Sequence, residues 1–219
     1  MIMIKPPILR AGAATLTLAV VTVIAGAGLS ACAPLLFSGA AVGVLMATDR
    51  RTSGAQIEDE GIELRSASRI RDSLTDRVHV NIASYNRQVL LTGEVPTADD
   101  RQLVEQTVSR VDNVRAVVNE LAVMGNTSLA QRSSDSLVTA KVKASMVDAK
   151  DLFANAFKVV TERGTTYLMG RVSQRESDRA TEIARGTSGV QKVVRVFEIV
   201  SEAELKNLLP TPAPGDAKK

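Results

Sequence analysis

The chain has 219 residues, of which 45% are hydrophobic, 23% are charged and 3% are aromatic, and its formal net charge is +3. Two of the basic residues lie in an N-terminal segment that is predicted below to be removed, so the remaining charge is 25 − 24 = +1 and does not indicate an acidic partner. Tryptophan is absent and aromatic residues are few, which argues against the mixed basic and aromatic surfaces with which proteins bind nucleic acid.

An apolar run from Ala11 to Leu29 follows a short cationic stretch and ends just before Cys32, the only cysteine of the chain. A cationic stretch followed by an apolar run is typical of an export signal. The sequence Leu29-Ser30-Ala31-Cys32 resembles a bacterial lipobox, in which small residues fit a signal peptidase and the cysteine thiol receives a diacylglycerol. We therefore predict a signal peptide over residues 1–31 and lipidation, with palmitate among the acyl chains, at Cys32. The alternatives are an uncleaved membrane anchor and a buried thiol.

The residue after the cysteine is Ala33 rather than an aspartate. By resemblance to bacterial lipoproteins, this favours the inner leaflet of the outer membrane, with the protein facing the periplasm. Several acyl chains, at about 0.8 kcal/mol per CH₂, would hold the protein there without a spanning helix. The apolar stretch 33–47 either lies along the membrane or packs against the first domain.

The rest of the chain contains two copies of one unit. The stretch "VLLTGEVPTADDRQLVEQTV" from Val89 aligns with "TYLMGRVSQRESDRATEIAR" from Thr166, 77 positions later. The copies are longer than solenoid repeats, which favours two small domains over an array. The predicted organisation is a linker over 32–55, a first domain over 56–124, a linker over 125–134, a second domain over 135–201 and a tail over 202–219 whose Pro-rich end is disordered.

In the first copy, apolar residues recur at helical spacing at Ala67, Ile70 and Leu74. Alternating apolar residues then predict two strands that are joined by a tight turn at 85–87. An amphipathic helix is expected over Ala98–Arg110, and a short valine-rich strand closes the unit.

The second copy repeats this order, with a helical face of Val138, Val142 and Met146, a turn at 163–164 and a helix over Arg175–Arg185. The order helix, strand, strand, helix, strand predicts an α+β fold in which a three-stranded mixed sheet carries both helices on one face. Each second strand ends with a glycine, where a bulge or a close backbone approach excludes a side chain. These glycines, Gly93 and Gly170, are interpreted as structural.

No catalytic constellation can be named in the sequence, so we expect no enzyme activity. The single histidine, His79, has no cysteine or second histidine to assist it, so no metal site and no cofactor are predicted. The carboxylates at 99–100 and 176–178 open predicted helices, where negative charge is favourable.

The motifs "VLLTGEV…VDNVRAVVNEL" and "YLMGRV…TSGVQKVVRVF" resemble BON domains, small α/β modules of bacterial envelope proteins. Two such units behind a lipobox are similar to the dual-BON outer-membrane lipoproteins. The resemblance implies binding of anionic phospholipids, such as phosphatidylglycerol and cardiolipin, through the second domain, enrichment at division sites and support of outer-membrane integrity.

The charges of the two copies agree with that implication. Residues 57–124 contain 8 basic and 12 acidic residues, whereas residues 135–200 contain 11 basic and 8 acidic. Only the second copy should therefore be drawn to an anionic surface. Its first helix carries Leu137, Lys141 and Ala144 on one face, with Lys143 nearby, which is typical of an interfacial helix. The alternative is that Leu137 packs under a loop and that the lysines form a solvated face.

A second function remains open. The sheet edges or the acidic first domain could dock onto an envelope protein, such as an assembly machine or a regulator of cell-wall enzymes. The protein would then act as an adaptor and not as a lipid binder.

Overall fold

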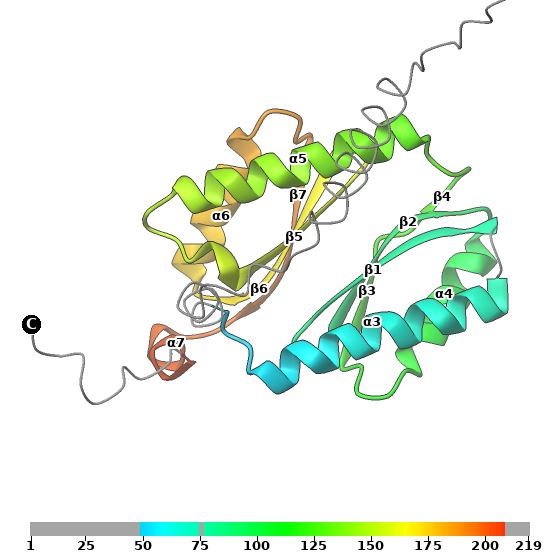
Figure 1. Cartoon of the computed structure of the whole chain (residues 1–219), viewed down its shortest axis with the longest axis horizontal. Coiled ribbons are helices and arrows are strands. Elements are labelled where there is room, and N and C mark those ends of the chain that lie inside the picture. The colour runs from blue at the N-terminus through cyan, green and yellow to red at the C-terminus, as the bar shows by residue number, and fades with distance from the viewer. Residues whose placement is uncertain (1–48, 75–76, 209–219) are drawn as a thin grey trace, which may run out of the picture. The chain divides into compact units, whose positions relative to one another are not determined.

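The computed structural model describes residues 49–74 and 77–208. The predicted signal peptide, Cys32, the apolar stretch 33–47 and the Pro-rich end of the tail lie outside these residues. The first domain consists of two helices and a sheet (Figure 1). Its elements are α3 (Ser53–Leu74), β1 (His79–Tyr85), β2 (Gln88–Val95), α4 (Ala98–Ser109), β3 (Ala116–Asn119) and β4 (Ala122–Val123).

The second domain repeats this order and adds a 3₁₀ turn and a final helix. Its elements are α5 (Leu129–Asp148), η3 (Ala154–Ala156), β5 (Phe157–Glu162), β6 (Thr165–Val172), α6 (Gln174–Gly186), β7 (Lys192–Ile199) and α7 (Glu202–Leu208). The predicted α+β fold with two tandem copies is confirmed.

Each sheet is mixed. β1 and β2 are antiparallel, and β2 pairs in parallel with both β3 and β4, which are two halves of one interrupted strand. In the second domain, β5 and β6 are antiparallel and β6 pairs in parallel with β7 over its full length. The parallel pair in each domain requires a crossover, which α4 and α6 provide. β1 and β5 are consequently edge strands.

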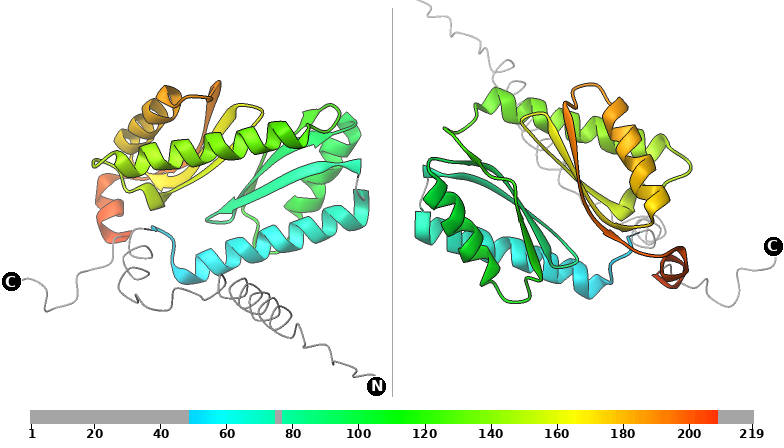
Figure 2. Two further views of the ribbon diagram at one scale, coloured as in Figure 1. Left: turned by 45° about the horizontal axis from the view of Figure 1, so that its top comes forward. Right: turned by 180° about the vertical axis from the view of Figure 1, so that it is seen from behind.

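Both helices of each domain cover the same face of their sheet (Figures 1 and 2). The apolar faces that the sequence predicted for the first helices are buried there: Ile70 and Leu74 in α3, and Val138, Val142 and Met146 in α5. Ala67 is only half-buried. Each large side chain that is fully removed from water in this way contributes roughly 1.5–3 kcal/mol to stability.

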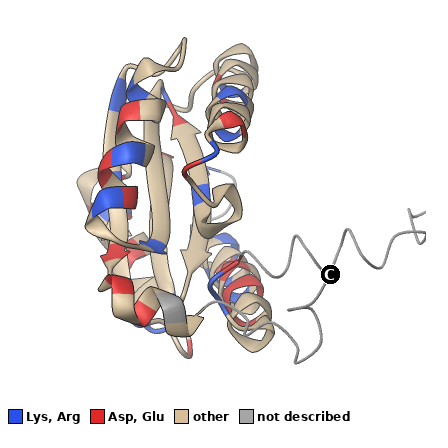
Figure 3. Ribbon diagram, turned by 90° about the vertical axis from the view of Figure 1, so that its left-hand side faces the viewer, with Lys and Arg blue, Asp and Glu red and all other residues tan. Residues whose placement is uncertain are grey.

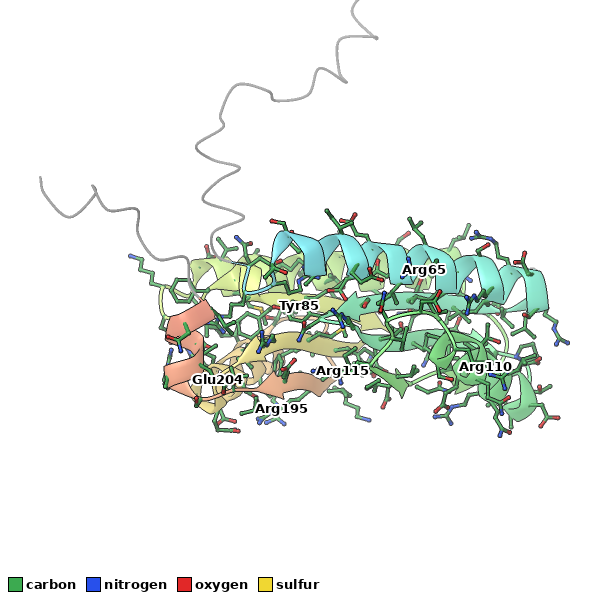
Figure 4. The ribbon with its side chains drawn as sticks, turned by 90° about the horizontal axis from the view of Figure 1, so that it is seen from below. Arg65, Tyr85, Arg110, Arg115, Arg195 and Glu204 are labelled. Carbon is green, nitrogen blue, oxygen red and sulfur yellow. The ribbon has the colours of Figure 1, made fainter. Side chains whose placement is uncertain are left out.

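The helix-free faces of the two sheets share a third apolar cluster. Tyr85 and Leu90 of the first domain pack with Tyr167, Met169 and Val196 of the second. The Tyr85 hydroxyl donates a hydrogen bond to the Ala156 carbonyl at 3.2 Å, and Figure 4 labels Tyr85 where the two domains meet. This contact between the domains was not expected from the sequence.

Polar bonds surround that cluster. Asn81 donates to Glu162 at 2.6 Å, and Asn86 and Arg115 both donate to Glu198, at 2.8 and 3.0 Å. Every one of these bonds joins a residue of the first domain to a residue of the second. The domains are therefore joined by an apolar centre with a hydrogen-bonded rim.

The segment before α3 contacts both domains through consecutive arginines. Arg50 forms a bidentate ion pair with Glu176 of α6 and donates to the Arg171 carbonyl at 2.8 Å. Arg51 pairs with Asp59 at 2.9 Å, and its guanidinium lies 4.4 Å from the centre of the Tyr85 ring. This segment is fixed at the junction, although the sequence placed it in a linker.

Two boundaries differ from the prediction. Helix α5 begins at Leu129, after the N-cap Ser128, so the predicted linker 125–134 is helical over its second half. Residues 129–134 contribute no buried side chain, and the apolar periodicity that indicates a helix is therefore missing there. Helix α7 lies within the predicted tail and buries Leu205. It begins at Glu202, directly after Ser201, whose hydroxyl accepts a bond from the Glu204 N–H.

Candidate functional site

Helix α5 is held against its domain by a buried carboxylate. Asp135 accepts hydrogen bonds from the N–H groups of Arg163 and Gly164, both at 2.9 Å, in the tight turn between β5 and β6. Both turn residues have positive φ, 49° and 71°, so their N–H groups point to one side and need an acceptor.

Asp59 of α3 does the same for the first domain. It accepts from the N–H groups of Asn86 and Arg87, both at 2.8 Å. The two first helices therefore correspond at an offset of 135 − 59 = 76 residues. Sequence reasoning missed both carboxylates, because 27 or 28 residues separate each acid from the turn that it binds and the acids are offset by 76 residues whereas the repeat is offset by 77.

The outward face of α5 carries a stripe of apolar side chains with one polar residue, Ser133, among them. Leu137 and Val147 are 64% and 68% exposed, and Ala140 and Ala144 lie exposed between them. At about 100° per residue, these four side chains and the exposed Leu129 fall within roughly 80° of the helix surface. The alternative in which Leu137 packs under a loop is wrong. The face is also longer than the predicted group of Leu137 and Ala144, because it extends to Leu129 and Val147.

Lysines border this apolar stripe on both sides, and the exposed carboxylate of Asp148 lies on the Leu137 border, about 20° beyond Leu137. Lys141 lies about 40° beyond Leu137 around the helix, and Lys143 lies about 40° beyond Val147 on the other border. Both are exposed. Within the described part of the chain, no carboxylate lies within ion-pair distance of Lys141, Lys143 or Lys150.

Most other cations of the second domain are already paired. Arg163 pairs with Glu94, Arg179 with Asp151 and Arg195 with Asp178. Figure 3 shows the resulting mixture of basic and acidic residues over the outer helices. The unpaired positive charge of the second domain is accordingly concentrated on α5 and just beyond its end, with a second group at Arg185 and Lys192.

The corresponding face of α3 differs in chemistry. With the offset of 76, Leu137 corresponds to Gly61, Lys141 to Arg65 and Lys143 to Ala67. Arg65 is already occupied, since it donates to Glu58 at 2.6 Å. Helix α3 exposes Leu64 between Glu60 and Arg71, so charges of both signs border its apolar patch.

Gly93 and Gly170, each two residues before the end of its strand and not at the end as predicted, approach the neighbouring backbone closely. Gly93 has φ +111°, and a Cβ atom there would lie 2.1 Å from the carbonyl oxygen of His79. A Cβ atom on Gly170 would lie 2.5 Å from the carbonyl oxygen of Ala156. Any side chain at either position would force backbone atoms apart.

The sequence-based exclusion of a metal site at His79 needs correction. The fold brings Glu94 and Glu162 to His79, with one potential ligand atom of each residue within 4.8 Å of the others. Counting cysteines and histidines overlooked these carboxylates. The cluster already contains a cation, however, because Arg163 donates to Glu94 at 2.5 Å, and Thr127 and His79 bind the other oxygen.

These contacts shift the pKa values of Glu94 and Glu162 in opposite directions. Burial raises the pKa of Glu94, but hydrogen bonds from Thr127, Arg163 and His79 outweigh this and hold the pKa below its ordinary value. Burial raises the pKa of Glu162, and the neighbouring Glu94 raises it further. The arrangement serves as an internal ion-pair network, not as an open metal site.

The predicted lipobox and Cys32 lie outside the described residues, and the structure does not test them. Among residues 49–74 and 77–208, no helix combines the length and apolar character needed to cross a membrane.

Comparison with known proteins identifies the fold. The model of the BON domain family matches residues 58–125 and again residues 134–201. The chain therefore belongs to the BON family and carries two copies of the domain.

Two curated relatives from bacteria match most of the chain. The chain is 37% identical over 172 residues to the outer membrane lipoprotein DolP of Haemophilus influenzae, covering 78% of this chain and 89% of that protein. It is 32% identical over 154 residues to a 21 kDa hemolysin of Actinobacillus pleuropneumoniae, covering 69% and 79%. The chain also aligns with a solved structure of CdsD, a structural protein of the type III secretion system of Chlamydia trachomatis, over 65% of this chain and 96% of that one. The TM-score of 0.27 and the identity of 13% are too low to support any argument.

Proposed function

We propose that this protein is an outer-membrane lipoprotein, anchored through Cys32 and facing the periplasm, whose second BON domain binds anionic phospholipids such as phosphatidylglycerol and cardiolipin. The observation that carries the proposal is the outward face of α5, where an exposed apolar stripe is bordered on both sides by unpaired lysines. The relative from Haemophilus influenzae, named as an outer membrane lipoprotein, supports the location.

The face suits the boundary between headgroups and acyl chains. Leu137 and Val147 can enter the apolar layer, while the lysines remain at the level of the phosphates. Each well-placed lysine contributes about 1 kcal/mol near an anionic surface. Lys141 and Lys143 have no internal partner to give up, so their approach to the membrane breaks no ion pair within the described residues.

The acyl anchor and the α5 face act together. An anchored chain presents the face at a high effective concentration, so a contact that is weak in solution becomes strong on the membrane. The resemblance to dual-BON lipoproteins extends the proposal to enrichment at division sites and support of outer-membrane integrity.

Co-sedimentation with vesicles tests the lipid-binding step. The chain from residue 33 onward, which lacks the acyl anchor, should bind phosphatidylglycerol vesicles at low salt and should leave phosphatidylcholine vesicles in solution. The double substitution Leu137→Glu with Lys141→Glu should abolish binding, because it adds two negative charges to the face and removes one positive charge.

A matched control is available on α3. Leu64→Glu with Arg71→Glu changes the charge by the same three units at exposed positions of the first domain and should leave vesicle binding unchanged. Equal loss of binding in both double variants would mean that only net charge matters, and unchanged binding in the α5 variant would remove the proposed site.

A further inference from the structure

The outer edge of β1 has free main-chain hydrogen-bonding groups at Val80 and Ile82, and the bonds of Ser84 show which way these groups point. The Ser84 N–H donates to Glu63 at 2.7 Å, and the Ser84 carbonyl accepts from Lys158 at 3.1 Å, so the main-chain groups of Ser84 point away from β2. In an antiparallel pair this orientation recurs at every second residue. Ile82 and Val80 therefore also present their N–H and C=O groups outward, and among the described residues nothing binds them.

A groove runs along this free edge. It has a volume of about 420 Å³ and lies between β1 and α3, which run beside each other in Figure 4. Leu64 and Ala67 of α3 form one wall, Val80 and Ile82 form the other, and the carboxylate of Glu60 stands at the rim. Glu60 is exposed and, within the described part of the chain, is not paired with a cation.

The second domain does not repeat this feature. When the two copies are aligned on their tight turns, at an offset of 77, Val80 and Ile82 of β1 correspond to Phe157 and Val159 of β5. Phe157 and Val159 are buried, at 7% and 4% exposure, whereas Val80 and Ile82 are only half-buried. Among the described residues, the β5 positions that correspond to this wall of the groove are therefore closed to solvent.

We propose that the groove between α3 and β1 binds an extended, basic segment of a partner protein, which adds to the first sheet as a further strand next to β1. The main-chain groups of Val80 and Ile82 would pair with the segment, and alternate apolar side chains of the segment would enter the groove. Glu60, together with the excess of 12 acidic over 8 basic residues in 57–124, selects basic side chains on the segment. A second copy of this chain fits poorly, because two β1 edges would bring their own acidic rims together.

Backbone NMR of the full chain in detergent micelles tests the site directly, with a capped peptide of alternating lysine and valine, six residues long, as the probe. A peptide of alternating glutamate and valine is its charge-reversed control. The lysine peptide should shift the amide signals of Val80 and Ile82 and protect them from hydrogen exchange. Shifts confined to other elements, or equal binding of the glutamate peptide, would overturn the proposal.

Two variants sharpen the test. In Ile82→Pro the outward N–H is lost while the bonds between β1 and β2 are kept, and edge strands tolerate proline at such positions. Loss of this donor should weaken peptide binding about fivefold. Glu60→Lys, at an exposed position that should not affect folding, should weaken it through charge repulsion, and the matched reversal Glu202→Lys on α7 should not. Full binding by both Ile82→Pro and Glu60→Lys would also rule out the site.

Discussion

Arg50 and Glu176 form a buried bidentate ion pair, with Nη1–Oε2 and Nη2–Oε1 distances of 2.7 and 2.6 Å and side chains that are 2% and 3% exposed. The pair connects the residue three positions before α3 to the first turn of α6. The Glu176 carboxylate also accepts from the Ser173 N–H at 3.0 Å, which completes the capping box of that helix.

Arg50→Ala should lower the free energy of unfolding by about 3–5 kcal/mol, because it leaves the Glu176 carboxylate buried without its partner. Chemical denaturation measures this loss. Arg195→Ala, which breaks the exposed pair with Asp178, is the control and should have a much smaller effect. Similar losses in both variants would show that the burial of Arg50 is not important.

Glu162→Gln and Glu94→Gln should change stability in opposite directions at pH 7 and above. The pKa of Glu162 is raised in the folded chain, so its ionised form opposes folding, and glutamine should stabilise the protein while keeping the bond from Asn81. The pKa of Glu94 is lowered, so its ionised form supports folding, and glutamine should cost about 1–3 kcal/mol.

The pH dependence of stability follows from the directions of these two pKa shifts. The stability that Glu94 contributes is present above its ordinary pKa of 4.5 and is lost as the pH falls through its lowered folded pKa. The stabilisation by Glu162→Gln should also disappear at low pH, where the carboxyl is protonated in both states. Denaturation curves between pH 3 and 8 would measure both effects, and an equal response of the two variants at pH 7 would contradict the assignment.

Gly93→Ala should destabilise the first domain by about 2 kcal/mol or more, since alanine at φ +111° is strained and its Cβ would overlap the His79 carbonyl. Gly125→Ala is a suitable control, because no atom lies within 4 Å of the Cβ position there. Thermal unfolding should therefore show a lower melting temperature for Gly93→Ala than for Gly125→Ala.

Leu137→Trp should strengthen binding to phosphatidylglycerol vesicles. The position is 64% exposed, so the larger ring can be accommodated, and indole suits the headgroup level. An additional buried area on the order of 50 Å² corresponds to about 1 kcal/mol, or roughly a fivefold gain in affinity.

The natural chain contains no tryptophan, so the introduced indole would be the only one and would report on its own surroundings. Its fluorescence should shift to the blue on vesicle binding. Leu64→Trp on α3 is the matched control, and a similar blue shift there would argue against α5 as the membrane contact.

Much of the fold could be predicted because the two copies repeat one order of periodicities. The alternation around 85–87 and 163–164 predicted both hairpins, and the spacing of Val138, Val142 and Met146 predicted the core face of α5. The same pattern placed Leu137 and Lys141 opposite that core, which is where the structure has them.

The contact between the domains could not be predicted in this way. Tyr85, Leu90 and Tyr167 alternate with residues that face the helices, and a strand that is buried on both faces has no polar side to show what covers it. The burial of Arg50 could not be predicted either, since a buried arginine and a solvated arginine in a polar linker have the same sequence pattern. Its partner Glu176 is 126 residues away.

The burial of Arg50 also limits the length of the tether between the lipid and the folded domains. With Cys32 lipidated as proposed, only 50 − 32 = 18 residues separate the lipid from a point fixed on the folded body. Fully stretched, they reach about 60 Å. On that proposal, Arg50 lies no farther than this distance from the lipid, and a periplasmic partner must approach the membrane to within a comparable range to meet the two domains.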